Sequence, residues 1–138
     1  MNDSTILCLA SEMKGLPLIE ECHAQGYHVI VLMDEKLKDD NWPWHAISEH
    51  FTLPDLSKQP DMLHTVSYLM RGRTIDRIVA LDDYDVATAA SLREHLRLPG
   101  MGETVVRFFR DKLAMRKQAQ EAGIRVPAFT GLFNYDEL

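Results

Sequence analysis

Short apolar runs alternate with helical patterns through the first hundred residues, and this alternation limits the possible folds more than any other feature. The runs are "TILCLA" (5–10), "YHVIVLM" (27–33), "HFTLP" (50–54) and "RIVALD" (77–82). Such runs are typical of strands in a covered sheet. The segments between them carry helical spacing, as in Met62, Val66 and Leu69. The pattern predicts an α/β fold, with helices on both faces of a parallel sheet and right-handed crossovers.

Composition narrows the class of protein. The chain has 138 residues, of which 46% are hydrophobic, enough for one compact domain with its own core and too few for two. A net charge of -6 gives no general attraction to phosphate-rich polymers, so we expect neither nucleic acid nor a membrane as partner. The first 14 residues fit neither a signal peptide nor a membrane span. Cys8 and Cys22 lack metal-ligand spacing, which favours buried thiols of a cytoplasmic protein.

The alternation stops at "LPGMGE" (98–103). We therefore expect a Rossmann-like, doubly wound domain over residues 1–101 and a different unit over residues 102–138. That unit should contain a helix beginning near Asp111, with a buried face of Met115, Ala119 and Ala122, and then a strand in "RVPAFTG". "LFNYDEL" (132–138) starts a helix or loop without a cap, as expected if the chain belongs to a longer protein.

Open parallel sheets bind ligands beyond the carboxyl ends of their strands, so the loops there carry the candidate site. Ser11, Glu12 and Lys14 follow the first run, and Asp82 and Asp83 follow the last. These aspartates have two interpretations: capping of the next helix, or recognition of an amine or hydroxyl of a substrate. Different aspartates can do different things, so both interpretations stay open.

Other cofactor sites are disfavoured. "ASEMKG" after the first run lacks the G-x-G-x-x-G pattern that lets a backbone approach a dinucleotide, although Asp34 could imitate a ribose-binding carboxylate. The six histidines have no ligand spacing, and the acid pair of phospho-receiver domains would follow an earlier strand. The sequence predicts no metal site.

Lys112 stands at the first position of the helix that Asp111 would cap. Free backbone N–H groups and the helix dipole favour an anion there, and a lysine adds a mobile charge. The alternative is an ordinary surface lysine, which is common on helices.

Residues 76–129 resemble a known junction. "DRIVALDDYDVATAASLREHL" leads through "LPGMGETVVRFFRDKLAMRKQAQEAGIRVPAF", in which "DK", a helix, "AG" and "VP" follow in order. This resembles ATP-grasp ligases, in which a Rossmann-like pre-ATP-grasp domain leads into the nucleotide-binding unit. The resemblance implies that Lys112 contacts ATP phosphates. By position, it implies that Ser11, Glu12, Asp82 and Asp83 bind part of the substrate.

The resemblance also implies a reaction. ATP-grasp ligases use ATP and Mg²⁺ to convert a carboxylate to an acylphosphate, with ADP formed, and an amine then attacks it. A second lysine and the metal ligands would lie in a C-terminal ATP-grasp domain beyond residue 138, so we expect no catalytic residue and no tightly bound ATP here. Exposed apolar residues after 102 would meet that domain or a second copy in a homodimer. The alternative is a stand-alone doubly wound binding or regulatory module without ATP chemistry, which would leave residues 102–138 without a sheet.

Overall fold

A four-stranded parallel sheet forms the centre of the molecule in this computed structural model, which describes residues 3–131. The strands are β1 (Thr5–Ala10), β2 (His28–Asp34), β3 (Glu49–Leu53) and β4 (Arg77–Ala80), in the order β3-β2-β1-β4. In the register, Thr5 lies opposite His28, Ile6 opposite Arg77, and Ile30 opposite Glu49. The predicted parallel α/β fold is confirmed.

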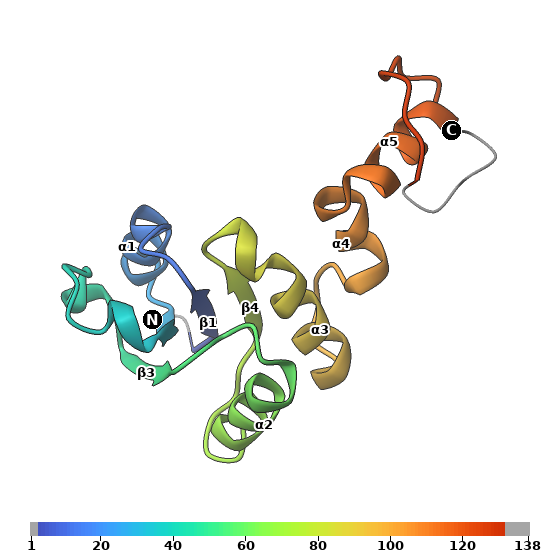
Figure 1. Cartoon of the computed structure of the whole chain (residues 1–138). Coiled ribbons are helices and arrows are strands. Elements are labelled where there is room, and N and C mark those ends of the chain that lie inside the picture. Colours follow the sequence, from blue (N-terminus) through green and yellow to red (C-terminus); the bar gives the residue numbers. More distant parts are fainter. Residues whose placement is uncertain (1–2, 132–138) are drawn as a thin grey trace.

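Helices cover both faces of this sheet (Figure 1). They are α1 (Leu16–Ala24), α2 (Gln59–Leu69) and α3 (Val86–Leu96). Successive side chains of β1 point to opposite faces, so Cys8 packs with Ile19 of α1 while Leu7 packs with Met62 of α2. Short 3₁₀ turns complete the connections at Glu35–Leu37, Trp44–Ala46 and Asp83–Asp85. The fold is therefore doubly wound, as the alternation predicts.

Two differences from the sequence prediction concern β4 and β3. β4 stops at Ala80 instead of residue 82, because Asp82 already accepts a hydrogen bond from the N–H of Tyr84 in the turn before α3. β3 lies at the edge of the sheet and is half covered, with alternating exposed positions, since only β2 pairs with it. Neither difference changes the topology.

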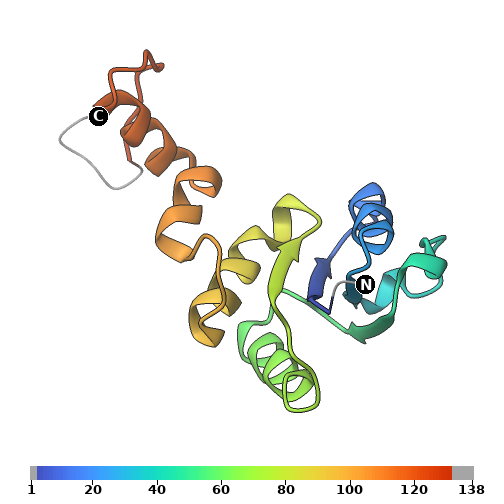
Figure 2. The ribbon, with the colours of Figure 1, turned by 180° about the vertical axis from the view of Figure 1, so that it is seen from behind.

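Two further helices, α4 (Glu103–Arg110) and α5 (Lys112–Glu121), extend away from the sheet (Figures 1 and 2). Arg93 of α3 ties the start of this extension to the sheet, because its guanidinium donates to the carbonyls of Ile78 (2.9 and 3.0 Å) and Met101 (2.8 Å). Glu94 of α3 accepts from the N–H of Glu103 at 2.9 Å. No helix among residues 3–131 is long and apolar enough to cross a membrane.

Two predictions about this extension are wrong. Met115 is 42% exposed, Ala122 is exposed, and α5 has no buried residue, because the helix contacts α4 and not the sheet. "RVPAFTG" has no regular secondary structure, because no strand runs beside it to complete a ladder. The predicted helix start is confirmed at Asp111. The expectation for "LFNYDEL" lies outside the described residues.

Candidate substrate and nucleotide site

The carboxyl ends of β1 and β4 meet at the point where the strand order reverses. From β1 the chain moves to β2 and β3 on one side, and then crosses to β4 on the other side. In open parallel sheets this switch point is where a ligand crevice forms. Gly15 ends the β1 loop with φ 72°, and a side chain there would stand 2.7 Å from Leu81 Cδ2 at the end of β4. Glycine therefore lets the two loops touch.

Ser11 and Asp85 join these loops through hydrogen bonds. The Ser11 N–H donates to Asp85 at 2.8 Å, and the Ser11 hydroxyl donates to the other carboxylate oxygen at 2.5 Å. Asp85 is only 2% exposed, so the pair fixes the β1 loop against the start of α3. Ser11 keeps its oxygen lone pairs for a ligand.

Asp82 and Lys14 form a second link at 2.7 Å. Asp82 is buried and also accepts from the N–H of Tyr84 at 2.9 Å, so it caps the 3₁₀ turn that leads into α3, whereas α3 itself has no side-chain cap. The Lys14 ammonium, then the backbone N–H of Tyr84, lower the pKa of this carboxyl, and Asp82 in turn raises the pKa of Lys14. The Lys14 side chain is 63% exposed, so the charge that this pair presents to solvent is positive.

Glu12 and Asp83 each meet a cation from another element. Glu12 pairs with Lys36, beyond β2, at 2.7 Å, and this raises the pKa of Lys36. Asp83 pairs with Arg110 of α4, while its own side chain is 72% exposed. Sequence reasoning found the acids but missed Lys36 and Arg110, which lie 24 and 27 residues away in sequence. The pairing of β1 with β2 brings Glu12 to Lys36, and the packing of α4 on α3 brings Arg110 to Asp83.

Lys112 lies at the start of α5, as predicted. The Asp111 carboxylate caps this helix by accepting from the N–H groups of Leu113 (2.9 Å) and Ala114 (3.2 Å). Lys112 is exposed, and its ammonium makes no hydrogen bond or ion pair with any residue from 3 to 131. The group is thus available for an anion at a helix start.

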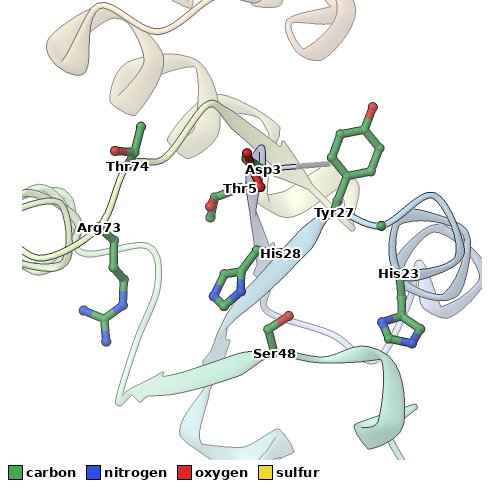
Figure 3. A pocket seen from close by; sticks show the side chains of 9 residues that line it. Asp3, Thr5, His23, Tyr27, His28, Ser48, Arg73 and Thr74 are labelled. Carbon is green, nitrogen blue, oxygen red and sulfur yellow. The ribbon is translucent and has the colours of Figure 1, made fainter. Parts of the chain in front are cut away.

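A separate cavity of about 650 Å³ opens at the opposite, amino edge of the sheet (Figure 3). Its lining residues include His28, Ser48 and Arg73. Their polar groups are paired: Glu49 accepts from Arg73 at 2.6 Å and lies 2.9 Å from His28, and Ser48 accepts from the N–H of Val29 at 3.0 Å. These bonds hold the beginnings of the strands, away from the loops described above.

Neither cysteine is placed for nucleophilic chemistry. Cys8 is fully buried in β1, and burial is the main cause that raises its pKa to about 12. Burial also raises the pKa of Cys22, which is 8% exposed. Because the thiolate is the reactive form, both side chains serve the core. Within the described part of the chain, no group of three or more His, Cys, Asp or Glu side chains is arranged to hold a metal ion.

Comparison with known families identifies the domain. A family model described as the ATP-grasp N-terminal domain matches residues 19–100, more than half of the chain. The chain belongs to this family. The match includes Asp82 and Asp83, whereas Ser11 and Glu12 precede it and Lys112 follows it. No curated protein matches the sequence.

Solved structures extend the likeness of this ATP-grasp N-terminal domain to nearly the whole chain. An L-amino acid ligase from Bacillus licheniformis matches with a TM-score of 0.77 and 23% identity, over 94% of this chain and 32% of that one. A phosphoribosylglycinamide synthetase from Anaerococcus prevotii matches with a TM-score of 0.74 and 18% identity, over 99% of this chain and 33% of its own. At such identities the likeness establishes the fold. The chain spans about a third of the length of these structures.

Proposed function

We propose that this chain is the substrate-side part of an ATP-grasp ligase that activates a carboxylate as an acylphosphate, with formation of ADP, for attack by an amine. The observation that carries the proposal is Lys112, whose ammonium has no partner among residues 3–131 and stands at a capped helix start that follows an ATP-grasp N-terminal domain. The similar structures are named as a ligase and a synthetase, which supports a bond-forming reaction.

Lys112 would contact the phosphates of ATP. Its ammonium and the N–H groups of the first turn of α5 favour an anion together, although Asp111 already occupies the N–H groups of Leu113 and Ala114. Mg²⁺ would neutralise charge on the phosphates in the intact enzyme. The described residues include no cluster that could hold the ion, so we assign no metal step to them. The remaining catalytic groups would come from a C-terminal ATP-grasp domain.

Ser11, Glu12, Asp82 and Asp83 would form the substrate side. The exposed Lys14 ammonium, oriented by Asp82, suits a carboxylate. The carboxylates of Glu12 and Asp83 and the lone pairs of the Ser11 oxygen, whose hydrogen is donated to Asp85, suit an amine. We further propose that the intact enzyme is cytoplasmic and that this chain alone neither hydrolyses ATP nor binds it tightly. Magnesium-dependent ATP binding below millimolar by the isolated chain, measured by calorimetry, would contradict the last point.

Replacing Lys112 tests the proposal in the full-length enzyme. Lys112→Ala should lower kcat/KM for ATP by roughly tenfold or more, since a charge-assisted contact to phosphate is lost. Lys117→Ala, on the exposed surface of the same helix, is the matched control. ADP formation and the melting temperature are measured for both variants, and neither substitution should change the melting temperature appreciably. If the two variants had equal kinetics, the proposal that ATP binds at the start of this helix would be wrong.

A stand-alone binding module is the second candidate, and the joined loops at the switch point are the observation in its favour, because they are complete within this chain. The ADP assay separates the two candidates. A module without ATP chemistry would show no ADP formation with any carboxylate and amine pair, even in the full-length protein.

A further inference from the structure

A cavity of about 390 Å³ lies where the starts of α2 and α3 meet α4, on the face of the sheet that α2 and α3 cover. Gln59 and Ala87 come from the first turns of α2 and α3. The α4 side contributes Glu103, Val106, Arg107, Arg110 and Asp111. Val106 is 2% exposed and gives the cavity an apolar floor. The volume falls in the range of pockets for small molecules, about 300 to 1,000 Å³.

Two of the charged groups in this cavity have a partner within residues 3–131, and two have none. Asp111 caps α5, and Arg110 pairs with Asp83. The guanidinium of Arg107 and the carboxylate of Glu103 make no hydrogen bond or ion pair with residues 3–131. They stand four positions apart on α4, and therefore on the same side of the helix. The cavity thus presents one cation and one anion beside an apolar surface.

We propose that this cavity binds a small zwitterion with an apolar body, namely a free amino acid with an aliphatic side chain. Arg107 binds the carboxylate, for which its planar fork is suited. Glu103 accepts hydrogen bonds from the ammonium, and Val106 with Ala87 contacts the aliphatic side chain. α2 begins without a side-chain cap, so the start of this helix adds positive potential near the carboxylate.

The biological role of this site rests on the proposed function, in which the amino acid supplies the carboxylate or the amine. Asp111 lines the cavity and directly precedes Lys112, so the site adjoins the proposed phosphate contact. The pair between Arg110 and Asp83 connects it to the loop that follows β4. Binding itself requires neither ATP nor metal, so it can be measured on the 138-residue chain.

Titration of the isotope-labelled chain by NMR tests the proposal with three probes: L-leucine, isocaproate, which lacks the ammonium, and isoamylamine, which lacks the carboxylate. L-leucine should give saturable shifts at the amides of Ala87 and Arg107, and the other two probes should bind more weakly. Arg107→Gln should weaken L-leucine roughly tenfold or more, because a charged hydrogen-bond partner is lost. Arg116→Gln, on the exposed surface of α5, should change nothing. Glu103→Gln should abolish the advantage of L-leucine over isocaproate.

Three results would overturn the site: no saturable shift at these amides, equal weakening by Arg107→Gln and Arg116→Gln, or equal affinity of wild type for L-leucine and isocaproate. Circular dichroism of each variant confirms that the helices are intact. A negative titration together with Lys112-dependent ADP formation would reject this site and leave the proposed function standing. A positive titration without ADP formation would support this site and reject the proposed function.

Discussion

The sheet region (residues 3–101) and the tail (residues 102–131) differ in how far their apolar side chains are buried. All six residues of β1 are buried, and so are five of the seven in β2. In the tail only Val106 is buried, while Phe109 is 61% and Ile124 is 62% exposed. The difference shows that burial requires a second layer: helices cover the sheet on both faces, whereas α4 and α5 have no sheet beneath them. We expect this exposed apolar surface to contact a partner domain or a second copy of the chain.

The largest expected effect comes from removing one apolar side chain in each region. Leu32 is fully buried in β2, so Leu32→Ala should lower the free energy of unfolding by about 2 to 5 kcal/mol through lost burial and a cavity. Phe109→Ala removes a larger side chain that is mostly exposed, and should change stability by less than about 0.5 kcal/mol. Urea denaturation of both variants measures the contrast. A similar loss for Phe109→Ala would show that the tail shares the core of the sheet region in solution.

An intermediate effect is expected at Arg93, which joins the two regions. Its guanidinium donates to the carbonyls of Ile78 and Met101, so Arg93→Ala leaves a partly buried carbonyl unpaired and should cost about 1 to 3 kcal/mol. Arg71→Ala, at an exposed position, is the control. Hydrogen exchange of the α4 amides should also become faster in Arg93→Ala. Unchanged exchange in α4 would mean that other contacts hold the tail.

The smallest expected effect is a dependence on pH that belongs to the sheet region alone. Hydrogen bonds from Arg73, and then from His28, lower the pKa of Glu49 from 4.5 to about 2. Because the folded-state pKa is the lower one, this stabilisation is complete above pH 4.5 and is lost as the pH falls toward about 2. In Arg73→Gln, the urea midpoint should depend less on pH over that range. Loss of the guanidinium near the Phe51 ring adds only an offset independent of pH. If the urea midpoint of Arg73→Gln depended on pH as steeply as that of the wild type, the pair between Arg73 and Glu49 would be excluded as the cause of that dependence.

The elements of the sheet region could be predicted because each carries its own signal in sequence. An apolar run such as residues 5–10 and a spacing such as Met62, Val66 and Leu69 report local structure directly, and the structure buries them as expected. The Asp111 cap is equally local and is also confirmed. In the tail the same rules predicted a buried face on α5, which is wrong because burial depends on what covers the helix. The division at residue 101 remains a proposal.

The candidate site could be predicted only in part. The residues after each strand were found because parallel strands bring their carboxyl ends to one edge. Their pairing was not found, because Ser11 meets Asp85 across 74 residues and Lys14 meets Asp82 only through the strand order. Asp82 caps the turn before α3 and is also the counter-ion of Lys14, whereas its predicted contact with a substrate stays a prediction. The roles of Ser11, Glu12, Asp83 and Lys112 stay predictions until the kinetic test.

The burial of both thiols has a practical consequence for spectroscopy. The chain contains two cysteines, Cys8 and Cys22, and both are in the interior of the sheet region. The raised pKa of each thiol suppresses the thiolate that maleimide dyes attack. A cysteine introduced at Gln120, which is exposed on α5, would therefore react first. One dye at that position would report the tumbling of the tail by fluorescence anisotropy, with both native cysteines left in place.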